Sequence, residues 1–312
     1  MASDSEVLEV RFLGGFSAAF RGTELADSKR SVSQFISLMQ LILYYHQSGV
    51  SRSLMQETLF SDRDVDDERH AVRNLLYNAK KRLRAAGLPD AEYITSEKGN
   101  YYWTKDIPLS CDTERMEHLA ALAGEETDTA ERLALLTEAV HCYRGEFLSG
   151  QNTASWMARE VVRYRDLFRS CANSAAMILR NDLRFKELLE LGDYAALVDP
   201  YAEWETLSVE ALSALYRFKE AEDLCDATVE RYIQEHGRRE PVYIRDLSNR
   251  LSASMVHRYA DIRTVVEENL SKFAVGDRDL AEWDDFINQL YDLGIEDCIA
   301  IQQQAVDRYL DR

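Results

Sequence analysis

A shortage of turn-forming residues constrains this chain more than any other feature. Its 312 residues include only 13 glycines and 4 prolines. Architectures built from many short strands need frequent turns rich in these residues, so the composition argues against them. The sequence therefore predicts a mainly helical protein, long enough for two domains that each have a hydrophobic core.

Charge divides the chain into two unlike parts. The formal net charge is −18. Residues 1–108 contain 14 basic and 15 acidic residues, whereas the rest contains 23 and 40. Such asymmetry is typical of parts that have different partners. The acidic part should avoid nucleic acid, and the first part can approach it only through a local basic face.

The sequence has no pattern typical of a secreted, membrane-bound or catalytic protein. The five cysteines are far apart in the sequence, which favours a reducing environment over redox or metal roles. The first residues lack a signal-peptide pattern, and the longest mostly apolar run, residues 35–45, is too short for a membrane span. The six histidines are scattered and no catalytic motif is present. We expect a cytoplasmic protein that is not an enzyme, with no cofactor, no metal site and no membrane contact.

The first hundred residues contain, in order, a strand pair, three helices and a hairpin. Residues 7–25 alternate apolar and polar around a Gly-Gly pair, which predicts two antiparallel strands. Helical periodicity covers residues 31–47, 51–60 and 66–86, and strand-forming residues around a Lys-Gly-Asn turn mark residues 91–103 as a hairpin. Three helices followed by a hairpin predict a winged helix-turn-helix, whose third helix is free to enter the major groove.

The third helix is basic within an acidic protein. From Arg69 to Arg84 the sequence has six basic residues and no acidic one. Apolar residues recur on it at helical spacing and predict one buried stripe: Val72, Leu76, Ala79 and Leu83. One role for these cations is to complement the dipole at the C-terminal end of a solvated helix. Its place in a helix-turn-helix favours DNA instead.

Candidate DNA contacts lie on this helix and on the hairpin. Cations would anchor phosphates, and asparagines are suited to adenine. The helix residues are Arg69, Arg73, Asn74, Tyr77, Asn78, Lys80, Lys81 and Arg84. The hairpin residues are Lys98, Asn100 and Tyr101. For the tyrosines and for Arg82, packing within the domain is the alternative.

From residue 109 onward the sequence is helical throughout, with amphipathic segments joined by short breaks. The stretches LGDYAA (191–196) and YRFKEA (216–221) are similar to the junctions of tetratricopeptide-type helical hairpins.

Residues 7–250 resemble bacterial transcriptional activators of the antibiotic-regulatory-protein type. The resemblance rests on LEVRFLGGF (8–16), on GVSRSLMQETLF with the HAVRNLLYNAKKRL that follows, and on CDTERMEHL (111–119) with AVHCYRGEFL (139–148). It implies a response-regulator-type winged helix-turn-helix followed by an all-α, tetratricopeptide-like bacterial transcriptional activator domain.

The resemblance also places the domains. We expect the winged helix over residues 5–106, the activator domain over 109–256, and a helical hairpin extension over 257–312. Within the extension, residues 259–310 are similar to the C-terminal helices of extracellular solute-binding lipoproteins. Without the two lobes of those proteins, the segment does not imply solute transport.

The function implied by the resemblance is that of a sequence-specific, DNA-binding transcriptional regulator of the activator type. Its helical domain would serve oligomerisation, effector sensing or contact with RNA polymerase. A homodimer would bind double-stranded DNA at repeated half-sites, and the sequence does not identify a small-molecule effector. The alternative is a helical-repeat adaptor whose winged helix binds another protein.

Overall fold

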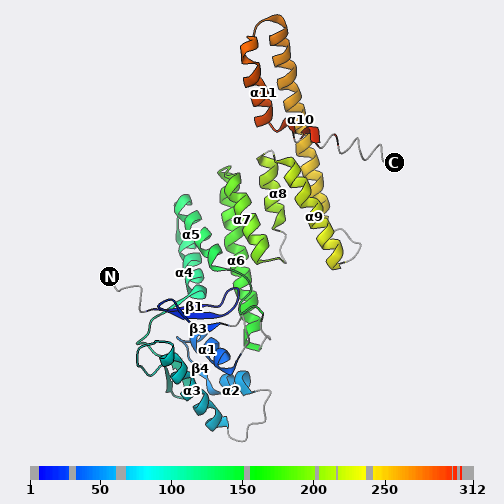
Figure 1. The fold of residues 1–312 in the computed structure, drawn as a ribbon. Helices are drawn as coiled ribbons and strands as arrows, with labels where there is room; N and C mark the ends of the chain where they lie inside the picture. Colours follow the sequence, from blue (N-terminus) through cyan, green and yellow to red (C-terminus); the bar gives the residue numbers. More distant parts are fainter. Residues whose placement is uncertain are drawn as a thin grey trace. The chain divides into compact units, whose positions relative to one another are not determined.

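The structure is a computed structural model that describes most of the chain (Figure 1). The described residues are 7–27, 33–60, 68–150, 155–200, 204–215, 217–236, 242–296, 298–300 and 303. Two compact units divide the chain, Met1–Ala175 and Ala176–Arg312. None of the described helices combines the length and hydrophobicity that a bilayer crossing requires.

The first unit begins with a four-stranded sheet. Strands β1 (Leu8–Arg11), β2 (Ser17–Phe20) and β3 (Thr23–Asp27) are antiparallel neighbours, and β7 (Leu109–Cys111) pairs with β1 in parallel. The order is therefore β3-β2-β1-β7. The sequence predicted the first two strands. It missed β3, which follows the tight turn at residues 21–22, and β7, whose partner lies far away in the sequence.

Three helices follow this sheet: α1 (Gln34–Tyr44), α2 (Arg52–Phe60) and α3 (Glu68–Ala85). The hydroxyl of Ser33 caps α1 by accepting the backbone N–H three residues on, at 3.4 Å. Ser51 caps α2 in the same way at 3.2 Å. All three predicted helices are confirmed. The first ends at Tyr44 rather than at residue 47, and residues 31–32 of the first prediction and 66–67 of the third lie outside the described part of the chain.

A three-stranded sheet completes the winged helix. It consists of β4 (Val50–Ser51), β5 (Ile94–Glu97) and β6 (Asn100–Trp103), in the order β4-β6-β5. Lys98 and Gly99 connect β5 to β6 with φ angles of 50° and 86°. A two-residue hairpin turn needs such left-handed angles at both positions, so it matches the twist of the strands. The predicted hairpin is confirmed.

Helices α4 (Asp112–Glu125) and α5 (Thr129–Cys142) pack together in the first unit, which also contains most of α6 (Ser155–Asn181). The side chain of Asp128 caps α5 by accepting two backbone N–H groups at 2.9 Å.

An aromatic cluster joins the winged helix to these helices. Phe147 stacks on Phe12 with ring centroids 5.7 Å apart, and the ring of Tyr44 lies 5.0 Å from Phe147. The Tyr44 hydroxyl donates to a carboxylate oxygen of Glu160 at 2.5 Å, and it lies 3.4 Å from the Tyr164 hydroxyl. Burial raises the pKa of both tyrosines, so their hydroxyls remain protonated hydrogen-bonding groups.

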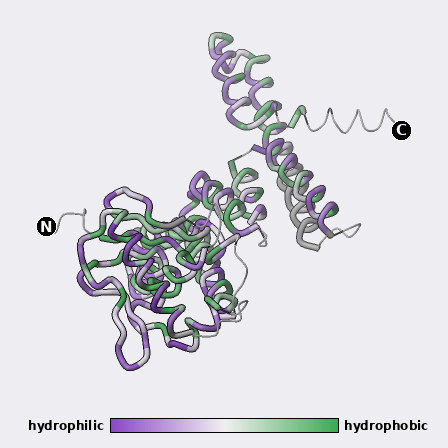
Figure 2. Tube along the Cα trace, turned by 60° about the horizontal axis from the view of Figure 1, so that its bottom comes forward, coloured by the Kyte–Doolittle hydropathy of each residue, from purple (hydrophilic) through white to green (hydrophobic). Residues whose placement is uncertain are grey.

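The second unit is helical throughout its described part. After the end of α6 its elements are α7 (Phe185–Val198), α8 (Glu205–Ala214), α9 (Phe218–His236), α10 (Val242–Val275), the 3-10 turn η1 (Leu280–Glu282) and α11 (Trp283–Asp292). Apolar and polar residues alternate along the helical turns (Figure 2). Gly192 allows α7 to approach α8, because a Cβ at this position would lie 2.6 Å from the Ser208 hydroxyl oxygen. The sequence predicted a junction between helices at LGDYAA, but residues 191–196 lie within α7.

Two apolar clusters stabilise the second unit. Side chains of α8 and α9 form the first: Val209, Leu212, Phe218, Ala221 and Cys225. Residues of α10, α11 and the chain beyond form the second: Ile262, Phe286, Leu290 and Cys298. Because α10 is continuous, the expected domain boundary at residues 256–257 falls inside one helix.

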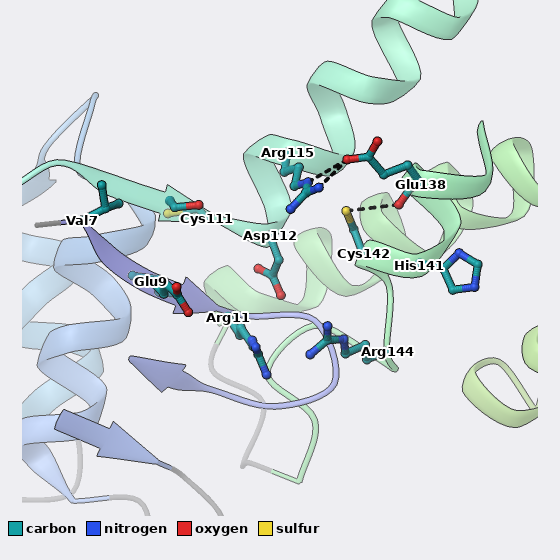
Figure 3. Close-up of a pocket in the computed structure, with 12 residues that line it drawn as sticks. Val7, Glu9, Arg11, Cys111, Asp112, Arg115, Glu138, His141, Cys142 and Arg144 are labelled. Atoms are coloured by element: carbon teal, nitrogen blue, oxygen red, sulfur yellow. Dashed lines mark hydrogen bonds and ion pairs between the residues drawn. The ribbon is translucent and has the colours of Figure 1, made fainter. Parts of the chain in front are cut away.

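The carboxylate of Asp112 fastens the first strand to the first helix of the helical region (Figure 3). One oxygen accepts the backbone N–H groups of Phe12 and Thr113, both at 2.9 Å. The other accepts those of Leu13 at 3.0 Å and Phe12 at 3.1 Å. Burial raises the pKa of Asp112 to about 6, against the opposing effect of these bonds and of Arg11.

Asp112 should therefore give stability a distinct pH dependence. Its pKa is higher in the folded protein than the ordinary value of about 3.9, so folding favours the protonated form. Its contribution to the free energy of unfolding is complete below about pH 4 and is lost as the pH rises through about 6, by about 2–3 kcal/mol in all. Urea unfolding of the wild type and Asp112→Asn between pH 4 and 7 measures this difference.

The control for this experiment is Asp106→Asn, because Asp106 is exposed. The free energy of unfolding of this variant should differ from that of the wild type by the same amount at every pH. Carbon-13 NMR of the Asp112 carboxyl group should show a midpoint near 6. A midpoint near 4 would contradict the assignment.

Candidate nucleic-acid interface

Helix α3 has one buried face, and the predicted apolar stripe forms it. Val72, Ala79 and Leu83 are 4%, 0% and 1% exposed, and Leu76 is half-buried. This stripe packs the helix into the winged helix and fixes which side chains point outward.

The opposite face of α3 is exposed and basic. Tyr77 is 70% exposed, which makes packing of its ring within the domain untenable. The other exposed candidates are Arg73, Asn74, Asn78, Lys81 and Arg84, and Lys80 is half-buried. Arg73, Tyr77, Lys80 and Arg84 follow one another at 4-3-4 spacing and form a row beside the buried stripe, about 100° around the helix from it. The side chain of Arg69 lies outside the described part of the chain.

Two cations of this helix already have partners within the domain. The Arg82 guanidinium lies over the ring of Phe35, 4.0 Å from its centroid. It therefore packs back on the domain, which was one of the two alternatives left open by the sequence. Arg84 forms an ion pair with Asp90, just beyond the helix. A phosphate would have to compete with that carboxylate for Arg84.

The wing offers one exposed cation at its tip. The Lys98 side chain is 90% exposed, and its Nζ lies 3.8 Å from a carboxylate oxygen of Glu97. Asn100 is half-buried. Tyr101 is only 9% exposed, because alternate residues of β6 face the interior, so we leave it out of the candidate contact surface.

Packing beneath the wing fixes its orientation. Trp103 donates its ring N–H to the Ile107 carbonyl at 3.0 Å, and its ring stacks on Tyr93 with centroids 6.1 Å apart. Elsewhere in the domain, the Gln34 amide donates to the Leu59 carbonyl at 3.0 Å and links α1 to the end of α2.

Sequence reasoning missed a pocket of about 600 Å³ beside β1, α4 and α5 (Figure 3). Its lining includes Arg11, Arg115 and Arg144 together with Asp112. Arg115 forms an ion pair with Glu138. No local pattern could reveal this pocket, because its residues come from separate parts of the sequence.

Sequence reasoning also missed a group of potential metal ligands in the described part of the chain. It consists of His46, Cys111 and Glu114. The sequence gave no spacing signal for it, since His46 is far from the other two residues in the chain.

The elements described so far define a class of protein. A response-regulator-type winged helix-turn-helix is followed by a tetratricopeptide-like helical array, which confirms the predicted fold class.

Comparison with known proteins agrees with this class. Residues 111–241 match the family described as the bacterial transcriptional activator domain. The fold is also similar to that of the solved structure of Mycobacterium tuberculosis EmbR in complex with a low-affinity phosphopeptide. That likeness has a TM-score of 0.53 at 15% identity and covers 83% of this chain and 71% of the EmbR chain. No curated protein matches the chain.

The contact between Arg82 and Phe35 leads to a stability prediction. Removing the guanidinium in Arg82→Ala should lower the free energy of unfolding by about 0.5–1 kcal/mol, which is usual for a partly exposed cation–π contact. The neighbouring change Lys81→Ala should alter it by less than about 0.5 kcal/mol. Urea unfolding measures both changes.

A double-mutant cycle isolates the contact from other effects of the substitution. In a Phe35→Leu background the cost of Arg82→Ala should shrink towards zero. An unchanged cost would show that Arg82 stabilises the domain in some other way.

Proposed function

We propose that this protein is a DNA-binding transcriptional regulator that inserts α3 into the major groove of its operator. One observation carries the proposal. The face of α3 opposite the buried stripe is exposed and has cations but no acidic residue from position 70 to the end of the helix. A helix of this kind at the third position of a winged helix suits groove insertion.

Different side chains of α3 would have different tasks. Arg73 and Lys81 are exposed and would neutralise phosphates. Asn74 and Asn78 would read base edges, because the asparagine amide can form two hydrogen bonds with adenine. Lys98 would reach a phosphate from the wing, whereas Arg84 would first have to leave Asp90.

The charge of the helical region supports a DNA-binding role for the winged helix alone. Residues 109–312 contain 23 basic and 40 acidic residues, so they repel DNA and restrict its approach to the winged helix. We propose that the helical region forms homodimers on repeated half-sites and contacts RNA polymerase. Helical arrays with extended surfaces are suited to both roles.

The salt dependence of binding tests the DNA proposal. With about five phosphate contacts, the logarithm of the affinity for duplex DNA should fall with the logarithm of the salt concentration at a slope of roughly −5. Arg73→Ala with Lys81→Ala should weaken binding to all sequences and make the slope shallower by about 2. Fluorescence anisotropy across a salt series measures both effects.

The matched control replaces one exposed arginine and one exposed lysine of the helical region, Arg159→Ala with Lys186→Ala. This pair should keep the wild-type slope. A flat salt response of the wild type, or equal effects of the two double variants, would refute the proposal and favour the adaptor, in which the winged helix binds protein. Selection of bound DNA from a random pool then identifies the operator.

A further inference from the structure

Three residues with metal-binding side chains meet where the winged helix joins the helical region. His46 follows the end of α1, Cys111 ends β7, and Glu114 lies in the first turn of α4. One ligand atom of each, a ring nitrogen of His46, the thiol sulfur and a carboxylate oxygen, lies within 4.8 Å of the other two. The contact between His46 Nε2 and Glu114 Oε1 is 3.4 Å.

The hydrogen bonds around His46 leave its Nε2 available. Its Nδ1 lies 2.9 Å from the Leu43 carbonyl oxygen, which can only accept, so Nδ1 carries a proton. In the neutral imidazole, Nε2 then presents a lone pair to the carboxylate of Glu114. Two acceptors at this distance need a positive charge between them. A metal ion supplies it, as does a proton on Nε2.

The surroundings match those of a metal site in a second respect. The Gln47 amide donates to the Glu114 carboxylate at 2.6 Å and orients it. Backbone carbonyls bonded to the far nitrogen of a histidine, and donors bonded to a ligating carboxylate, are the usual outer partners of metal ligands. Both are present before any metal binds.

Cys111 completes the set as a buried thiol, 4% exposed. Burial raises its pKa, and the charges of Glu114 and Asp112 raise it further, so the thiol is neutral without a cation. A bound divalent ion reverses this balance. As the metal–sulfur bond forms, the S–H bond breaks and the proton leaves to solvent.

We propose that His46, Cys111 and Glu114 bind one divalent transition-metal ion of the zinc class, with the fourth coordination position left to water. Nitrogen, sulfur and carboxylate ligands at about 2.0–2.3 Å suit zinc, whereas magnesium and calcium prefer oxygen alone. Tetrahedral bonds of that length place ligand atoms roughly 3.3–3.8 Å apart. The His46–Glu114 distance already fits, and a small rotation of the side chains brings in the sulfur.

Such an ion would tie the end of α1 to the start of α4. This tie would add to the hydrogen bonds of Asp112 and to the β1–β7 pairing, so metal binding should further stabilise the joint between the winged helix and α4. This role goes beyond DNA binding by α3, and metal binding is measured without DNA.

The first test uses cobalt(II) as a spectroscopic probe of the full chain under reducing conditions. One cobalt ion per chain should bind with an ultraviolet thiolate-to-cobalt charge-transfer band, and zinc should displace it. Cys111→Ser should abolish the band. Cys142→Ser is the matched control, because Cys142 is half-buried and lines the neighbouring pocket but lies outside the ligand group, and it should keep the band.

The second test measures zinc affinity by competition with a coloured chelator. Glu114→Gln and His46→Gln should weaken binding by about tenfold or more. Glu125→Gln, an exposed change on the same helix, should retain the wild-type affinity. Circular dichroism verifies that each variant is folded, and Glu114→Gln, at a partly exposed position, carries the test if His46→Gln does not fold.

The results can overturn the proposal in two ways. Absence of a thiolate band in the wild type would mean that a protonated His46 simply pairs with Glu114. A band that survives in Cys111→Ser, or zinc affinity that Glu114→Gln leaves unchanged, would mean that metal binds elsewhere in the chain.

Discussion

The first unit depends on the hydrogen bonds that one carboxylate accepts. Asp112 accepts backbone N–H groups from the end of β1 and from its own helix, and so joins residues that are about a hundred positions apart. Without it, the N–H groups of Phe12 and Leu13 would lose their partner, at a cost of about 1–3 kcal/mol for each that stays buried. The parallel pairing of β1 with β7 begins beside the same residue. The winged helix and α4 therefore form one structural unit rather than two domains joined by a flexible linker.

Side chains extend this joint in two directions. On one side, the stacked rings of Phe12 and Phe147 lead to the hydroxyls of Tyr44 and Tyr164. Tyr164 in turn donates to Glu117 of α4 at 2.6 Å. On the other side lie the three potential metal ligands. Interactions of three kinds therefore meet at one boundary, which explains why the compact unit ends well inside the helical region rather than after the wing.

The sequence predicts well what local periodicity encodes. The three helices, the wing hairpin and the stripe on α3 all follow from patterns within about twenty residues. Contacts between distant segments have no such signal, which is why β7 and the ligand group were missed. Tyr101 shows a different limit. Strand residues alternate between faces, but the sequence of a short strand with tyrosine on both sides does not show which face is buried. The sequence likewise left open whether Arg82 faces DNA or packs on the domain. The position of Phe35 in the structure decides this, because the Arg82 guanidinium lies over its ring.

The continuity of α10 has a mechanical consequence. Its 34 residues give a length of about 51 Å. It packs against α8 and α9 and also against α11, so one rod connects the two apolar clusters of the second unit. In a continuous helix each added residue advances the far end by about 1.5 Å and turns it by about 100°. The number of residues in α10 therefore sets the direction in which α11 projects from α10, relative to α8 and α9.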